Sequence, residues 1–76
     1  MEIKMYRGVD SFDDSLSMFA VVCGTDQVAV CQTFEGDDHW MTPESFGDPL
    51  RWSYVSKETF PHLISCIENA ELIWQK

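Results

Sequence analysis

Apolar and polar residues alternate at the start of the chain. Over residues 2–7, Ile3 and Met5 fill one set of alternating positions, while Lys4 and Tyr6 fill the other. Because successive side chains of a strand point to opposite faces of a sheet, this pattern predicts a half-buried first strand.

The polar segment that follows, residues 8–15, has the composition of a turn, with Gly, Ser and three Asp. Asp10 or Ser11 can cap a short helical turn, whose positive dipole end would stabilise Asp13 and Asp14. We therefore expect a loop or one helical turn after the first strand.

Residues 17–34 contain two runs rich in Val, Phe and Cys, separated by Gly24, Thr25 and Asp26, and predict a β-hairpin. With Thr25 and Asp26 as the loop, the expected pairs are Val28 with Cys23, Val30 with Val21 and Gln32 with Phe19. One face, predicted to be the core, then carries Phe19, Val21, Cys23, Val28 and Val30. The other carries smaller residues that are still apolar, so the hairpin is expected to be central and partly covered on both sides.

The three cysteines, Cys23, Cys31 and Cys66, are an odd number without CxxC spacing. This indicates reduced thiols in place of a disulfide framework. The two-residue loop puts Cys23 and Cys31 on opposite faces. A three-residue loop would put them on the same face, but still not opposite each other.

Two further elements are expected between residues 42 and 55. Thr42 as N-cap, Pro43 at the first helical position, Glu44 near the positive dipole end and Gly47 as a stop predict one helical turn. A turn at Asp48 and Pro49 would then lead into a strand over residues 50–55, where apolar and polar residues alternate.

The main helix is predicted over about residues 59–69. Thr59 is the expected cap, Pro61 lies in the first turn, and the apolar stripe consists of Phe60, Leu63, Ile64 and Ile67. We prefer an end near Asn69, which tolerates a left-handed conformation, followed by a strand over residues 71–75 with Leu72 and Trp74 on one side and Ile73 on the other. The alternative is a helix that continues to Trp74.

Together these elements predict a single α+β domain over residues 1–76. It would contain an antiparallel sheet of four or five strands, with one main helix packed on one face. A chain of this length buries too little surface for two cores, and its apolar content is too high for a disordered chain.

Charge is segregated along the chain. The formal net charge is -8, from 13 acids and five bases, and none of the bases lies within residues 8–50. That interval contains nine acids: Asp10, Asp13, Asp14, Asp26, Glu35, Asp37, Asp38, Glu44 and Asp48. Such a field excludes direct binding to nucleic acid or an anionic membrane, and it favours a basic partner.

Catalytic and metal-binding signals are weak. Asp37, Asp38 and His39 resemble a ligand cluster, but neighbouring side chains of an extended chain diverge, and no second His or Cys lies at ligand spacing. His62 is interpreted as a residue flanking the helix, and the acidic surroundings raise thiol pKa values. With no phosphate-binding glycine loop either, we expect neither an enzyme nor a bound cofactor or metal.

The sequence therefore predicts a small acidic binding protein. We expect a stoichiometric inhibitor of the immunity, antitoxin or phage anti-defence type, which occupies a basic, nucleic-acid-binding surface of a partner protein, such as a nucleic-acid-processing enzyme, by charge mimicry. The expected partner-binding residues are Asp10, Asp13, Asp14, Glu35, Asp37, Asp38, Trp40, Glu44 and Asp48.

The alternative is a structural or assembly module that pairs through a sheet edge or as a homodimer, with acidity serving solubility only. No membrane span or signal peptide is visible in the sequence, so a cytoplasmic location is expected. The sequence leaves open whether Trp40 points into the core or out among the acids, and whether the acids share one face.

Overall fold

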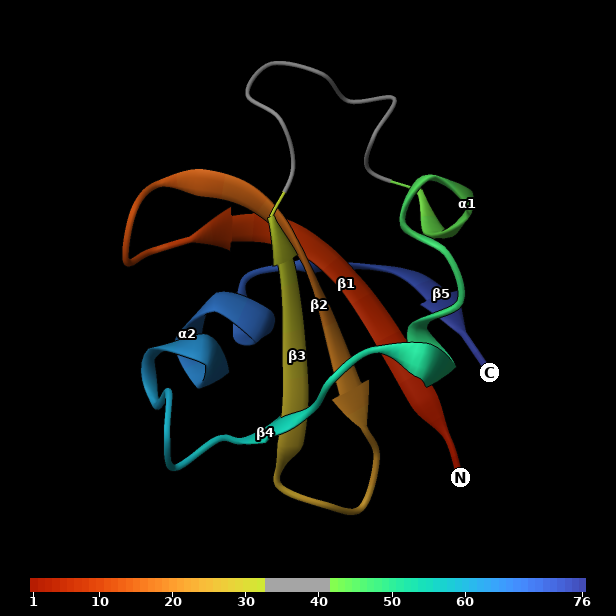
Figure 1. Cartoon of the computed structure of the whole chain (residues 1–76). Helices are drawn as coiled ribbons and strands as arrows, with labels where there is room; N and C mark the ends of the chain where they lie inside the picture. Colours follow the sequence, from red (N-terminus) through yellow and green to blue (C-terminus); the bar gives the residue numbers. More distant parts are fainter. Residues whose placement is uncertain (33–41) are drawn as a thin grey trace.

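The computed structural model describes residues 1–32 and 42–76, which form an antiparallel five-stranded sheet in the order β4-β3-β2-β1-β5 (Figure 1). The strands are β1 (Ile3–Asp10), β2 (Ser15–Val22), β3 (Gln27–Gln32), β4 (Val55–Ser56) and β5 (Glu71–Gln75). The helical elements are α1 (Pro43–Phe46), a 3-10 turn η2 (Pro49–Arg51) and α2 (His62–Glu68). The predicted α+β class, an antiparallel sheet with one main helix, is confirmed.

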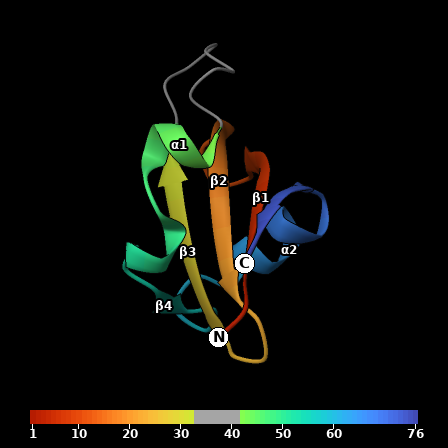
Figure 2. The same cartoon turned by 90° about the vertical axis from the view of Figure 1, so that its right-hand side faces the viewer.

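The sheet has a different cover on each of its faces. Turned by 90°, the molecule shows α2 on one side of the sheet and α1 with η2 on the other (Figure 2). We call these the helix face and the aromatic face. On the helix face, Phe19 and Val28 pack with Leu63 and Cys66 of α2. On the aromatic face, the cover consists of Leu16, Phe46, Trp52, Tyr54, Ile73 and Trp74.

The first strand forms as predicted and continues to Asp10. Ile3 and Met5 are buried on the aromatic face, because their alternation matches the pleat. A single helical turn then leads into β2: the amide of Phe12 donates to Asp10 Oδ1 at 2.9 Å, and the amide of Asp14 donates to the Asp10 carbonyl at 2.8 Å. Asp10 thus caps the turn, as expected.

The hairpin of β2 and β3 is confirmed, but its predicted register is wrong by two residues. Val28 pairs with Val21 and Val30 with Phe19, because the loop contains four residues, from Cys23 to Asp26. Gly24, at φ 80°, supplies the left-handed conformation that this longer turn requires.

The predicted core face survives this shift, since moving a strand by two residues returns every side chain to the same side. Phe19 and Val28 are fully buried there, and Val21 and Val30 pack against them. Cys23 lies in the turn instead of in a strand pair. All three cysteines are free.

The chain between β3 and α2 departs from the expected strand over residues 50–55. The predicted turn from Pro43 to Phe46 is present, and Gly47 follows it at φ 79°. Asp48 then accepts a hydrogen bond from the Leu50 amide and starts η2, so only Val55 and Ser56 pair with β3. Alternation was misleading here, because an Asp-Pro pair stabilises a helical turn as readily as it precedes a strand.

The main helix is shorter than predicted, and the face that it packs against the sheet differs from the predicted one. It begins at His62, and no side chain, Thr59 included, caps it. Leu63 and Cys66 are its buried residues, whereas Phe60 and Ile64, both assigned to the apolar stripe, are exposed. A Cβ added at Gly8 of β1 would lie 2.9 Å from Ala70 Cβ, so glycine allows the chain that leaves α2 to pack closely on β1.

The predicted final strand is confirmed as β5, although Asn69 ends the helix at φ -100° and is not left-handed. Met5 pairs with Trp74 and Tyr6 with Leu72, so β5 contains one extra residue, Ile73, at a bulge. The bulge places Ile73 and Trp74 together on the aromatic face, where the sequence predicted them on opposite sides.

Candidate functional site

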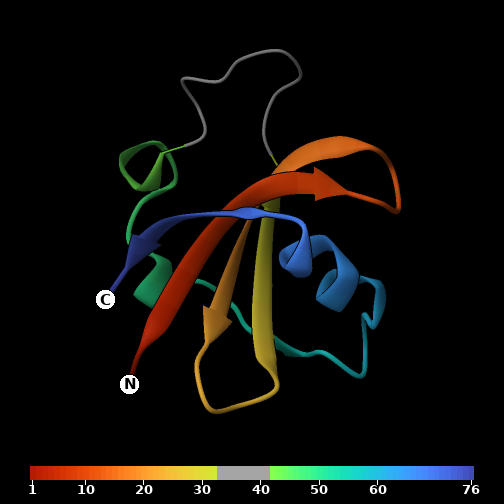
Figure 3. The same ribbon diagram turned by 180° about the vertical axis from the view of Figure 1, so that it is seen from behind.

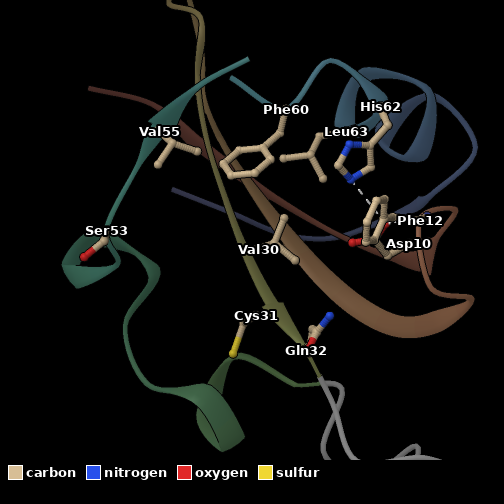
Figure 4. Close-up of a pocket in the computed structure, with 10 residues that line it drawn as sticks. All are labelled: Asp10, Phe12, Val30, Cys31, Gln32, Ser53, Val55, Phe60, His62 and Leu63. Carbon is tan, nitrogen blue, oxygen red and sulfur yellow. Dashed lines mark hydrogen bonds and ion pairs between the residues drawn. The ribbon is translucent and has the colours of Figure 1, made fainter. Parts of the chain in front are cut away.

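A groove of about 610 Å³ remains on the helix face beside α2. The seven residues of α2 span about 10 Å, whereas the eight-residue strands span about 27 Å, so the helix covers only part of the sheet. The groove lies over the end of β3 and is lined by Asp10, Phe12, Val30, Cys31, Gln32, Ser53, Val55, Phe60, His62 and Leu63 (Figure 4).

The walls of the groove are aromatic and aliphatic. Phe60 lies just before α2 and Leu63 in its first turn, Val30 lies on β3, and Phe12 stands across from them on the β1–β2 turn (Figure 4). Phe12 is 82% exposed, an unusual degree for so large an apolar side chain. The His62 ring lies 5.6 Å from the Phe12 ring and 6.2 Å from the Phe60 ring, measured between centroids.

One carboxylate lies at the Phe12 side of the groove. The side chain of Asp10 is only 9% exposed, and its Oδ1 lies 3.4 Å from His62 Nε2. The same oxygen accepts the Phe12 amide, so it holds the turn that carries Phe12. The ten lining residues include no Lys or Arg, which makes the acid and the imidazole the only ionisable groups there besides the Cys31 thiol.

The cysteines near the groove are poorly suited to nucleophilic chemistry. Burial raises the pKa of the Cys31 thiol, which keeps it protonated near neutral pH. The buried Cys66 accepts a hydrogen bond from the Ser11 amide at 3.3 Å, so it joins α2 to the β1–β2 turn. An Asp–His pair without an activated nucleophile can bind a polar group or transfer a proton.

The predicted partner-binding residues have different surroundings. Asp10 is buried at the groove, whereas Asp14, Glu44 and Asp48 are exposed. Asp14 lies in the β1–β2 turn at φ 59°, and Asp48 caps η2. Glu35, Asp37, Asp38 and Trp40 lie outside the described residues, as does His39.

Asp13 connects two of the acidic segments. Its side chain accepts hydrogen bonds from the hydroxyl and the amide of Ser15, and the Ser15 hydroxyl, with further hydrogen bonds, lowers the pKa of this carboxyl. Its second oxygen accepts a hydrogen bond from Gln32 Nε2 at 2.8 Å. The β1–β2 turn therefore adjoins the end of β3, which leads into residues 33–41.

Neither a metal-ligand cluster nor a membrane-spanning helix occurs in residues 1–32 and 42–76. These residues contain no group of three or more His, Cys, Asp or Glu side chains able to hold a metal ion. They also contain no helix long and apolar enough to cross a membrane.

Comparison of the chain with models of protein families, with curated proteins and with solved structures found no match in any of the three. The function of the candidate site is therefore inferred from the chemistry of its residues alone.

The sequence did not predict the groove, because the groove depends on how far α2 extends over the sheet. The available signal was Phe12, a large apolar residue among five polar neighbours in a turn.

Proposed function

We propose that this chain is a small acidic binding protein that inhibits a partner by occupying its basic, nucleic-acid-binding surface. Carboxylates would pair with the partner's Lys and Arg side chains in place of phosphates. The observation that carries the proposal is the absence of any base from residues 8–50, which contain nine of the 13 acids. Solubility alone does not require such separation of the signs.

The strand directions support this proposal. Asp13 and Asp14 occupy the turn where β1 ends and β2 begins, and β3 ends beside them at Gln32. Figure 1 shows α1, which carries the exposed Glu44, in the upper part of the view, on the other side of the end of β3 from this turn.

Two of the five bases lie toward the other end. The Lys57 amide donates to the Asp26 carbonyl in the β2–β3 loop, and Lys4 pairs with Val21 near that loop. Lys76, by contrast, lines the same pocket as Glu44 and Asp48. A charge distribution of this kind gives the molecule a direction of approach to a basic surface and accelerates association at low salt.

The test compares two triple charge reversals of equal size. In the first variant, Lys replaces three acids within residues 8–50: Asp37, Asp38 and Glu44. In the control variant, Lys replaces three exposed acids outside that interval: Glu2, Glu58 and Glu68. Each immobilised variant is used to capture proteins from the native host, and captured proteins are assayed for nucleic-acid binding with and without the wild-type chain.

We expect the wild type and the control to capture a basic protein and to compete with its nucleic acid, while the acidic-interval variant fails in both assays. Affinity should also fall steeply between low and moderate salt. Equal capture by both triples, or competition that does not change with salt, would contradict charge mimicry.

Assembly through a sheet edge is the second candidate. Among the described residues, β3 is paired on its outer edge only at Gln27 and Val28, where β4 meets it. The rest of that edge, residues 29–32, has no strand partner within residues 1–32 and 42–76, and an edge of this kind can accept another strand. A partner bound in this way would be retained at high salt, and a homodimer would double the mass measured in solution.

A further inference from the structure

The groove beside α2 combines an apolar lining with one carboxylate, as ligand-binding sites commonly do. Phe12, Phe60, Val30 and Leu63 make its walls apolar, yet Asp10 places a carboxylate at one side. A purely apolar ligand would cover that carboxylate without donating a hydrogen bond to it, in an environment drier than water. The chemistry favours a ligand with an apolar or planar body and a positive end.

The Asp10 carboxylate can accept further hydrogen bonds. Its Oδ1 receives the Phe12 amide and faces His62 Nε2 at 3.4 Å, which is long for a charge-assisted hydrogen bond. Among the described residues no hydrogen bond reaches Oδ2. Because the side chain is nine-tenths buried, a cation that reached it would be screened little by solvent.

Charge complementarity determines the sign of the occupant. No Lys or Arg lines the groove, and the chain as a whole carries a formal charge of -8. Anionic ligands are disfavoured by both the local and the overall field.

We propose that this groove receives an arginine side chain from the basic partner, an inference that rests on the proposed function and names a central contact for it. The aliphatic part of the arginine would lie along Val30 and Leu63, and its planar guanidinium would stack on Phe12 and pair with Asp10. Arginine suits the site better than lysine, since its donors form a fork and its plane matches an aromatic face.

This contact would differ from the exposed acids in its energetic role. Exposed ion pairs contribute little to affinity and act mainly on the association rate. An arginine enclosed by aromatic side chains and paired with a buried acid is typical of the few residues that dominate a binding energy.

The test uses small probes and the intact protein. Amide chemical shifts of the ¹⁵N-labelled chain are followed during titration with N-acetyl-arginine amide, its neutral analogue N-acetyl-citrulline amide, and the apolar N-acetyl-norleucine amide. We expect saturable shifts at Phe12, Val30 and Leu63 with arginine, and about tenfold weaker binding of citrulline, the difference between charged and neutral hydrogen bonds.

Two variants and one control locate the site. Asp10→Asn keeps an oxygen for the Phe12 amide but removes the charge, and Phe12→Ala removes the stacking surface; each should weaken arginine binding at least about fivefold. Asp26→Asn removes the charge of a carboxylate that accepts two side-chain hydrogen bonds in the β2–β3 loop, and it should leave arginine binding unchanged.

Equal binding of citrulline or norleucine would overturn the proposal, as would unchanged binding to Asp10→Asn or shifts spread over the surface acids. The result is separable from that of the charge-reversal test. Arginine binding in the groove would persist if the acidic interval proved irrelevant to capture. Conversely, a salt-sensitive partner could be captured by a chain whose groove binds no arginine.

Discussion

The two faces of the sheet are covered in different ways. On the aromatic face, large rings from α1, β5 and the residues before β4 pack over Ile3, Met5, Met18, Ala20 and Val22. On the helix face, α2 packs over Phe19 and Val28 but leaves the end of β3 uncovered (Figure 3 shows the molecule from behind).

The difference shows that irregular chain can cover a sheet as well as a helix does. One aromatic side chain buries about 150–250 Å², and several of them can be placed independently along a strand. A helix of seven residues has a fixed short length, so the sheet beyond its end remains accessible. In this molecule the accessible part is the groove.

The largest expected effect is on the helix face. Phe19→Ala would remove a fully buried ring from the cluster with Val28 and Leu63, at a cost of about 3–5 kcal/mol. That is comparable with the whole stability of a domain of this size. We expect loss of cooperative thermal unfolding, monitored by circular dichroism; a variant destabilised by under about 1 kcal/mol would show that α2 contributes little to the core.

A smaller loss is expected on the aromatic face. Trp52 packs against Ile3, Ala20 and Val22 and also against Met5 and Met18. Its Nε1 donates a hydrogen bond to the Phe46 carbonyl at 3.3 Å. Trp52→Ala should cost about 3 kcal/mol, while Trp52→Phe, which loses only the hydrogen bond and part of the ring, should cost about 1 kcal/mol. Denaturant unfolding of both variants would measure the difference, and equal losses would assign the effect to the hydrogen bond alone.

The smallest effect is expected at the groove. Phe12→Ala should change the free energy of unfolding by less than about 0.5 kcal/mol, because the ring is 82% exposed. Urea unfolding of this variant beside Phe19→Ala would separate a ring that supports the fold from one that does not. A loss above about 1 kcal/mol would mean that Phe12 belongs to the core.

The parts of the fold that follow from local alternation were predictable. Ile3 and Met5 identified β1, and the faces of the β2–β3 hairpin were correct although its register was not, since a two-residue shift conserves them. Alternation failed at residues 50–55 because Asp48 caps a 3-10 turn there, and at Ile73 because a bulge inserts one residue.

The candidate site was less predictable than the fold. His62 was interpreted as flanking the helix, and it does occupy the first position of α2, but its contact with Asp10 joins residues 52 positions apart. Phe60 lies two residues before α2, and its position at the groove depends on how the packing of Leu63 and Cys66 places α2 on the sheet. Tertiary packing of this kind leaves no periodic trace in the sequence.

The two ends of the chain lie side by side, since the Ile3 amide donates to the Lys76 carbonyl and the Lys76 amide donates to the Ile3 carbonyl. A short peptide linker could therefore join them, and new termini could be opened in the β2–β3 loop, which would give a circularly permuted chain with the same sheet. The ends also lie away from the β1–β2 turn (Figure 1). Fluorophores or surface tethers attached at either terminus would accordingly leave the groove and the neighbouring acids accessible to a partner.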